Sequence, residues 1–113
     1  MDPGCIFCRI VTGEVPAQIA YQDDYAVAFY DIRPVAPVHL VVVPRRHLVP
    51  PDAFNEADAL GHLLEAAARA AASEGIAATG YRLVINVGED AGQEVQHLHA
   101  HLLGGRHLAW PPG

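Results

Sequence analysis

The segment His97–Leu103, with the sequence His-Leu-His-Ala-His-Leu-Leu, alternates histidines with apolar residues. Successive side chains of an extended segment point to opposite faces, so the three histidines share one face and Leu98, Ala100 and Leu102 share the other. Histidines spaced in this way lie about 6.6 Å apart along a strand. The alternation therefore predicts a strand whose apolar face lies in a core and whose other face carries three imidazoles.

Three neighbouring imidazoles have two chemical uses, and the residues alone leave both open. A His-x-His pair on a strand can bind a catalytic metal, because both rings reach one point. Alternatively, the central histidine acts as a nucleophile while its neighbours bind a phosphate. A neutral imidazole with a pKa near ~6.5 is available at neutral pH for such chemistry.

Composition limits the class of partner. The chain has 113 residues, with 7 Lys+Arg against 13 Asp+Glu and a formal charge of −6. This length suits a single domain with one core, which we expect to cover residues 1–113. An acidic chain without a basic run is poorly suited to binding nucleic acid, because phosphate backbones attract Lys and Arg. A single small phosphorylated molecule is still a suitable ligand.

No segment of the sequence suggests a membrane span or an export signal. The longest strongly apolar run, Leu40–Pro44, is far too short to cross a bilayer. The Met1–Gly4 start shows no basic region followed by an apolar one, so we expect no signal peptide. We therefore expect a cytoplasmic protein without a membrane partner.

The remaining patterns predict an α+β fold. Apolar residues recur at helical spacing between about Asp52 and Ser73, which predicts one long helix, and Gly4 to about Thr12 suits a short one. Segments rich in β-branched and aromatic residues predict five strands. These are Ile19–Gln22, Tyr25–Tyr30, His39–Pro44, Tyr81–Val87 and His97–Leu103. We expect an antiparallel five-stranded sheet with one long helix on a face.

The histidine alternation resembles the His-φ-His-φ-His-φ-φ signature of the histidine triad (HIT) superfamily, in which φ is an apolar residue. Further segments are similar to the Hint branch, whose members are nucleoside phosphoramidases. They are IFCRIVTGEVPA, DIRPVAPVH, VVPRRH, YRLVINVG, GQEVQHLHAHLLGGR and WPPG. The resemblance covers nearly the whole chain and implies hydrolysis of a purine nucleoside monophosphate that is joined through a P–N bond to an amine or a lysine.

The resemblance also implies roles for individual side chains. His99 is the nucleophile that attacks the α-phosphorus and becomes nucleotidylated. His101 and His39 donate to the phosphoryl oxygens, and Gln93 is a further contact on the phosphate side. Preoriented donors of this kind are each worth about 3 kcal/mol to a transition state.

The nucleoside has its own expected contacts by the same resemblance. Asp31 accepts the ribose hydroxyls, and Asn86 lies near the sugar and the phosphate. Apolar side chains form the walls around the purine; they are Phe7, Ile10, Phe29 and Ile32. Glu94 also belongs to the expected nucleotide site, but many eukaryotic Hint proteins carry Ser at this position, whereas bacterial-type members have Glu. We expect Glu94 to tune protonation of the leaving amine.

Cys5 and Cys8 form a second motif, Cys-x-x-Cys. By itself this motif suits a redox pair, two packed residues or half of a metal site. Some triad proteins with this motif, and the related hexose-1-phosphate uridylyltransferases, bind structural zinc through two Cys, a His and the first triad His. The resemblance therefore implies a structural zinc at Cys5, Cys8, His47 and His97, with no catalytic cofactor.

Two other functions that use the same nucleophile are also consistent with the sequence. One is a dinucleoside-polyphosphate hydrolase or nucleotidyl transferase, and the other is a nucleotide-binding adaptor whose chemistry is incidental. The resemblance also implies a two-fold homodimer formed through the strand Tyr81–Val87 and the long helix. A strand this rich in β-branched residues would otherwise leave an open edge.

Overall fold

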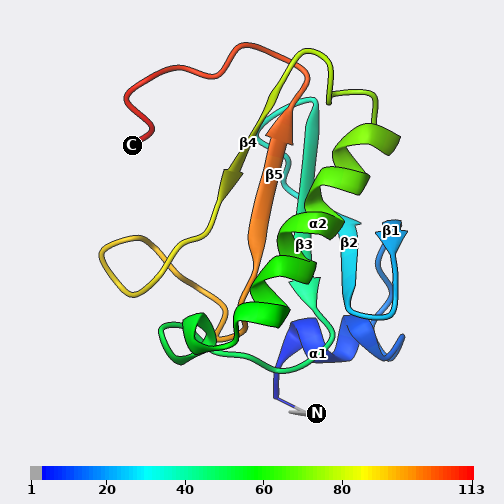
Figure 1. Cartoon of the computed structure of the whole chain (residues 1–113), viewed down its shortest axis with the longest axis vertical. Coiled ribbons are helices and arrows are strands. Elements are labelled where there is room, and N and C mark those ends of the chain that lie inside the picture. Colours follow the sequence, from blue (N-terminus) through cyan, green and yellow to red (C-terminus); the bar gives the residue numbers. More distant parts are fainter. Residues whose placement is uncertain (1–3) are drawn as a thin grey trace.

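The computed structural model describes residues 4–113; residues 1–3 of the predicted domain, and with them most of the Met1–Gly4 start, lie outside it. One antiparallel sheet has the spatial order β1-β2-β3-β5-β4 (Figure 1). Its strands are β1 Ile19–Gln22, β2 Ala26–Tyr30, β3 Val38–Pro44, β4 Tyr81–Val84 and β5 Ala100–Gly104. The helices are α1 Ile6–Val11, the short 3₁₀ helix η1 Asp52–Asn55, and α2 Ala57–Ser73. The predicted α+β fold is confirmed.

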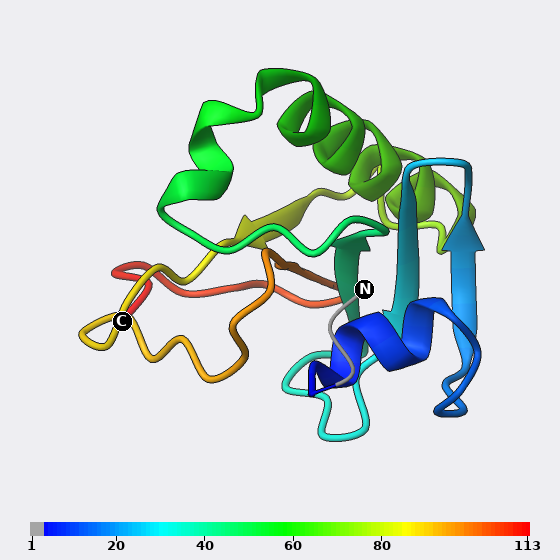
Figure 2. The same cartoon turned by 90° about the horizontal axis from the view of Figure 1, so that it is seen from below.

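The long helix α2 covers one face of the sheet (Figures 1 and 2). It presents Leu63 and a row of small residues to the sheet, which lets the helix lie close to the strands. The sheet contributes alternate residues of β2, β3 and β5, all fully buried; they are Ala26, Ala28, Leu40, Val42, Ala100 and Leu102. The expected apolar face of the histidine segment is therefore confirmed, because Leu98 joins the same core.

The short helix α1 lies on the opposite face (Figure 2). The residues that alternate with those of the first core point to this side and pack with α1, and they form a second, smaller core. Its buried members are Cys5, Phe7, Cys8, Val27, Phe29, Val41 and Val43. This core is the smaller of the two, and a cavity beside it is lined by residues of α1, β2, β3 and β5.

Strand β5 starts at Ala100, three residues later than predicted. Its ladder with β3 ends at the pair Val42↔Ala100. Continued in the same register, the next two positions would pair Val43 with His99 and Pro44 with Leu98, and Pro44 has no N–H to donate. The residues before Ala100 instead form hydrogen bonds to the last residue of β3 and to the segment after it. The Leu98 N–H donates to the Leu48 carbonyl, and the His97 ring donates to the Pro44 carbonyl. His97 and His99 therefore precede the strand that carries His101.

Two further element bounds differ from the sequence prediction. Strand β4 ends at Val84, which pairs with His101, three residues before the predicted end at Val87. The predicted long helix is interrupted at Glu56, whose φ of −102° and ψ of 74° separate η1 from α2. None of these helices, within the described chain, is long and apolar enough to cross a membrane.

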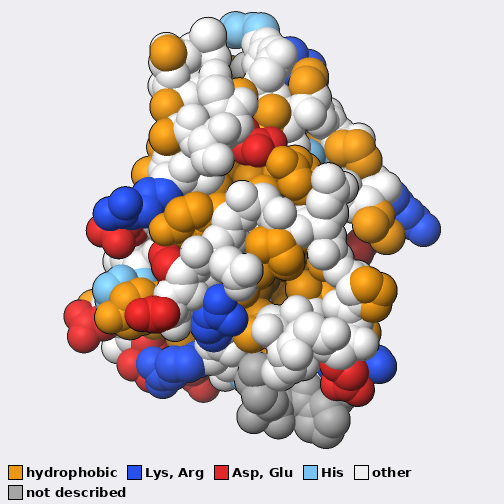
Figure 3. Space-filling model, turned by 90° about the vertical axis from the view of Figure 1, so that its right-hand side faces the viewer, with side chains coloured by type: hydrophobic (Ala, Val, Ile, Leu, Met, Phe, Trp, Pro, Cys, Tyr) orange, Lys and Arg blue, Asp and Glu red, His pale blue; other side chains and the backbone are white. Residues whose placement is uncertain are grey.

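The surface seen from the right-hand side of Figure 1 carries charges of both signs (Figure 3). Arg9 and Glu14 lie 3.6 Å apart at the end of α1. Arg69 and Glu65 lie 3.8 Å apart on the exposed side of α2. Both of these arginines therefore lie next to a carboxylate.

Candidate active site and metal cluster

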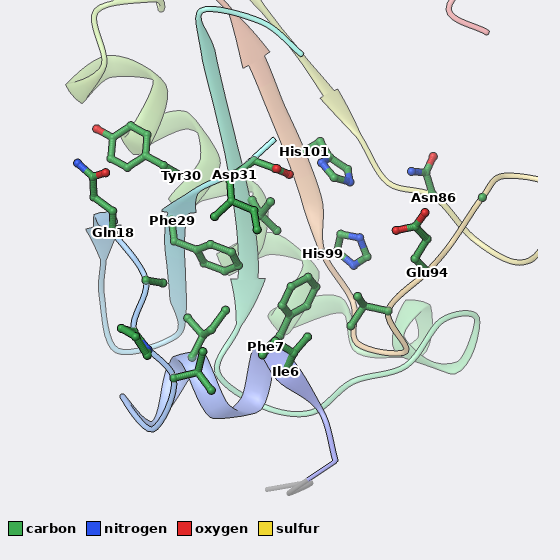
Figure 4. Close-up of a pocket in the computed structure, with 18 residues that line it drawn as sticks. Ile6, Phe7, Gln18, Phe29, Tyr30, Asp31, Asn86, Glu94, His99 and His101 are labelled. Carbon is green, nitrogen blue, oxygen red and sulfur yellow. The ribbon is translucent and has the colours of Figure 1, made fainter. Parts of the chain in front are cut away.

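A cavity of about 640 Å³ opens on the α1 side of the sheet (Figure 4). Its walls come from α1, the approach to β1, the end of β2, the histidine segment and the loop around Asn86–Val95. Nine residues predicted from the sequence line it: Phe7, Ile10, Phe29, Asp31, Ile32, Asn86, Glu94, His99 and His101. Pockets of 300–1,000 Å³ hold typical small ligands, so a mononucleotide fits this volume.

His99 is 7% exposed, and the hydrogen bond of its ring fixes its tautomer. Nδ1 lies 2.7 Å from the His97 carbonyl oxygen. A carbonyl can only accept, so Nδ1 carries the proton and donates it. Nε2 of the neutral ring is then unprotonated. Because His99 lines the cavity, this nitrogen is available as a nucleophile.

His101 has the opposite tautomer, and His39 sets it. The Val35 backbone N–H donates to His39 Nδ1 at 3.1 Å, so His39 carries its proton on Nε2. That Nε2 donates to His101 Nδ1 at 2.9 Å. Nε2 of His101 therefore holds the proton, and this ring is a hydrogen-bond donor. His101 lines the cavity beside His99, and the two ring centroids are 5.2 Å apart.

Burial favours the neutral form of both the His39 and the His101 ring. Desolvation lowers the pKa of His39 below the ordinary 6.5, partly offset by the Asp31 carboxylate. Desolvation also lowers the pKa of His101, and the neighbouring His99 and His39 lower it further. Neutral rings are what these hydrogen bonds require, because Nδ1 of His39 and Nδ1 of His101 must each accept a hydrogen bond.

Asp31 follows β2 directly and faces the cavity. One carboxylate oxygen accepts from the Arg33 backbone N–H at 2.7 Å, and the other lies 3.4 Å from His39 Nε2. The first contact fixes the turn after β2, and the second lies beside the His39–His101 pair. The carboxylate is therefore held at the cavity wall, where it can accept further hydrogen bonds.

Two predicted site residues are not among the described residues that line the cavity. His39 has both ring nitrogens engaged with Val35 and His101. The Gln93 side chain is also engaged: its oxygen accepts from the Gly88 N–H at 2.9 Å, and its nitrogen donates to the Val95 carbonyl at 3.1 Å. His39 therefore orients His101, and Gln93 closes the loop on which Glu94 lies.

The structure adds cavity residues that the sequence analysis missed. Those labelled in Figure 4 are Ile6, Gln18 and Tyr30, and Val41 and Val95 also line the wall. Val41 was predictable, because it alternates with His39 on one strand and so shares its face. Gln18 had no local signal: it lies in the connection before β1, and only the tertiary fold brings that connection to the cavity.

The four predicted metal ligands form one cluster. Their ligand atoms all lie within 4.8 Å of one another. Cys5 Sγ lies 3.3 Å from His97 Nδ1, and Cys8 Sγ lies 3.3 Å from His47 Nδ1. The two Nδ1 atoms are 3.3 Å apart. Tetrahedral zinc bonds of about 2.0–2.3 Å place neighbouring N and S ligands roughly 3.3–3.8 Å apart, so the separations fit a metal site.

The surroundings of the cluster also favour a metal. His97 Nε2 donates to the Pro44 carbonyl at 3.0 Å, which directs the lone pair of Nδ1 toward the thiols. Both cysteines are buried and unpaired, so no disulfide competes for their sulfurs. Burial raises the pKa of the Cys5 thiol, which disfavours a thiolate without a cation beside it. The four residues are therefore able to hold a metal ion.

Comparison with known proteins agrees with this geometry. The HIT domain family model matches residues 12–108, so the chain belongs to the HIT family. An uncharacterized HIT-like protein of Synechococcus elongatus is 50% identical over 116 residues, with 100% of each chain covered. A HIT family hydrolase from Legionella pneumophila has a TM-score of 0.92 and 46% identity, covering 97% of this chain and 100% of that one. A histidine triad protein from Clostridium difficile has a TM-score of 0.91 and 41% identity, covering 96% of each chain.

Proposed function

We propose that the protein hydrolyses purine nucleoside phosphoramidates, in which an amine nitrogen is bonded to the phosphorus of a purine nucleoside monophosphate. One observation carries the proposal. His99 holds its proton on Nδ1 against a backbone carbonyl, which leaves Nε2 as a nucleophile at a cavity of mononucleotide size. This activity would place the protein in the Hint branch of the HIT family.

In the first step His99 Nε2 attacks the phosphorus, and the P–N bond breaks. The amine leaves with the bonding electron pair and takes up a proton. The nucleotidylated ring is positively charged, and its Nδ1–H donates to the His97 carbonyl, which stabilises that charge. The Nε2–H of His101 is the donor for a phosphoryl oxygen, and one such donor is worth about 3 kcal/mol.

In the second step water attacks the phosphorus of the nucleotidyl-histidine and releases the nucleoside monophosphate and neutral His99. One water is consumed over the two steps: its hydroxyl ends on phosphorus, and its remaining proton balances the one gained by the amine.

Glu94 lies across His99 and His101 from the aromatic walls (Figure 4). We assign its carboxyl group to the leaving-group side, where it tunes protonation of the amine.

The nucleoside part of the substrate is assigned to the other side of the cavity. The apolar walls suit a purine ring; they are Phe7, Ile10, Phe29 and Ile32. The Asp31 carboxylate is the acceptor for the ribose hydroxyls, and Asn86 is the amide beside the sugar and phosphate. In this arrangement His39 positions His101, and Gln93 positions the loop that carries Glu94.

We also propose that the metal cluster holds a structural zinc. Cys5, Cys8, His47 and His97 would supply a closed set of two thiolates and two imidazoles, as structural zinc sites do. A bound zinc would cross-link α1 to the two segments that lead into the active site. Two reduced thiols also suit a reducing compartment such as the cytoplasm.

The charges that line the cavity favour a phosphoramidate over a dinucleoside polyphosphate as the substrate. Within residues 4–113, no arginine or lysine lines the cavity, whereas Asp31 and Glu94 do. A polyphosphate leaving group would find no cation there, but an amine leaving group needs none. The test is turnover of adenosine 5′-phosphoramidate and a diadenosine polyphosphate side by side, with nucleoside monophosphate release measured by chromatography.

We expect faster turnover of the phosphoramidate, and loss of that turnover in His99→Ala. Preferred turnover of the polyphosphate would replace the proposal with a dinucleoside-polyphosphate hydrolase. Binding of adenosine monophosphate without turnover of any phosphoramidate would identify a nucleotide-binding adaptor instead.

A further inference from the structure

A second pocket, of about 370 Å³, adjoins the cavity. Gly92 and Glu94 line both spaces, so the two pockets are neighbours at this point of the loop. The rest of the second pocket is lined by Pro50, Pro51, Val87, Gly88, Glu89, Gln93 and Gln96. None of the nucleoside walls named above lines the second pocket, so this pocket extends the site away from the purine side.

The loop that forms this pocket is held by its own hydrogen bonds. The Gln93 amide bonds to Gly88 and Val95, and the backbone adds Gly92 N–H to Glu89 carbonyl at 3.0 Å and Gln93 N–H to Gly88 carbonyl at 3.1 Å. Gly88 and Gly92 have positive φ values of 83° and 79°, which glycine adopts without strain. Glu89 and Glu94 are therefore carried by an ordered turn.

The chemistry of the pocket is apolar with an acidic rim. Pro50, Pro51 and Val87 offer carbon surface, and Glu89 and Glu94 supply two carboxylates. Neither carboxylate forms an ion pair with a side chain in the described part of the protein, and no arginine or lysine lines the pocket there. A ligand with an aliphatic stem and a terminal cation complements this arrangement.

We propose that this pocket is the subsite for the leaving group, and that it selects amines whose aliphatic chain ends in a second ammonium group. The inference rests on the proposed phosphoramidase function, because it assigns the space beyond the phosphorus to the amine. The chain would lie against the two prolines and Val87, and the distal ammonium would lie near Glu89. A distal carboxylate would meet like charges and bind worse.

The test uses four adenosine phosphoramidates on the native protein. Their amines are ammonia, pentylamine, cadaverine and δ-aminovalerate, so the last three have similar chains that end in a methyl, an ammonium or a carboxylate. We expect kcat/KM to fall in the order cadaverine, pentylamine, δ-aminovalerate at low ionic strength. Each exposed charge interaction should be worth about two- to fivefold in rate. The order should flatten in high salt, because both carboxylates are exposed.

Glu89→Gln is the decisive variant, because Glu89 lines only the second pocket. It should lower the cadaverine-to-aminovalerate ratio by about two- to fivefold and leave hydrolysis of the ammonia compound unchanged. Asp90→Asn is the matched control: it removes a neighbouring exposed carboxylate that lines neither pocket, and it should keep the native ratio.

The outcomes separate the two proposals. Hydrolysis of all four compounds with equal kcat/KM would overturn the subsite and leave the phosphoramidase function standing. An equal fall of the ratio in Asp90→Asn would also overturn it, because the effect would then come from net charge. Failure of the native protein to hydrolyse even the ammonia compound would overturn the proposed function and the subsite together.

Discussion

At the residue scale, His99 and His101 differ in the partner of Nδ1. His99 Nδ1 faces a backbone carbonyl and must donate, whereas His101 Nδ1 faces the Nε2–H of His39 and must accept. The same residue type, repeated two positions later, therefore presents an unprotonated Nε2 in one case and an Nε2–H in the other. This pairing gives the cavity one nucleophile and one donor.

Loss of the donor should slow hydrolysis without abolishing it. His101→Ala removes one hydrogen bond to the phosphoryl oxygens, and we expect kcat to fall by about 10²–10³. His107→Ala, which replaces an exposed histidine after the end of β5, should keep native activity. Steady-state rates on adenosine phosphoramidate provide the measurement, and native kcat in His101→Ala would show that the ring is not the donor.

His39 should act through His101, and a pH profile shows this. His39 lowers the pKa of His101, so His39→Asn should raise that pKa and move the acidic limb of the kcat profile to higher pH. A smaller kcat than native is expected as well, because the tautomer of His101 is no longer fixed. A reduced kcat with an unmoved acidic limb would point to a general structural defect.

The lowered pKa values of His39 and His101 also predict how stability depends on pH. The unfolded chain protonates these rings near pH 6.5, before the folded protein does, so the free energy of unfolding should fall as the pH drops below about 6.5. The groups that face them are His99, Asp31 and Glu94. Melting temperatures at pH 7.5 and 5.5 measure the effect in the native protein and in His39→Asn/His101→Asn. The double variant should lose less stability between these two pH values, and an equal loss would contradict the assignment.

At the element scale, local pattern predicted which face each strand residue occupies better than where each strand begins. The alternation around His99 correctly placed Leu98, Ala100 and Leu102 in the core. It did not predict the start of β5, because that depends on Pro44 in a partner strand, which cannot donate to the ladder. The interruption at Glu56 was missed for a similar reason: Ala53 is buried by tertiary contacts that the helical period does not encode.

The helix α1 is only six residues long, and a metal bound by Cys5, Cys8, His47 and His97 would join it to the segment after β3 and the segment before β5. We expect about one equivalent of zinc in protein purified without a metal-affinity tag, and none in Cys5→Ser/Cys8→Ser. Structural zinc sites contribute about 10–16 kcal/mol in small peptides, so losing even about 2 kcal/mol should lower Tm by roughly 10 °C.

Elemental analysis and a thermal melt test this prediction, with turnover as the third readout. We expect turnover to be only partly reduced in the double cysteine variant, because a closed site supplies no position for substrate. Native protein without metal would leave the two cysteines as packing residues. A Cys5→Ser/Cys8→Ser variant with the native Tm but no activity would show that the four-residue site is catalytic rather than structural.

At the scale of the whole molecule, the cavity joins segments that lie far apart in the sequence. Phe7 comes from α1, Asp31 from the end of β2, and Glu94 from the loop before the histidine segment. Motif resemblance predicted many of these residues, since family motifs carry tertiary information. Gln18 lies outside these motifs, and Ile6 lies in the IFCRIVTGEVPA segment but was not assigned to the site. Their positions follow from how α1 and the approach to β1 pack, which no local pattern specifies.

The open edges of the sheet bear on assembly. The edge strands are β4, where Tyr81 is 37% exposed, and β1, where Ile19 is 40% exposed. We predict a two-fold homodimer through β4 and α2, with a mass twice that of the 12.1 kDa chain by light scattering at micromolar concentration. Tyr81→Glu should dissociate it, because two-fold pairing brings like charges together, whereas Ile19→Glu on the opposite edge should not. A native monomer would contradict the prediction.

The proposed chemistry requires a covalent bond between His99 and the nucleotide. The most direct measurement is a rapid quench of the protein with adenosine phosphoramidate, followed by proteolysis and mass spectrometry of the peptide that spans the histidine segment. We predict an adenylyl group on His99 in the native protein, no adduct in His99→Ala, and a loss of turnover of at least about three powers of ten in that variant. Turnover without any adduct, or an adduct on another residue, would contradict nucleophilic catalysis by His99.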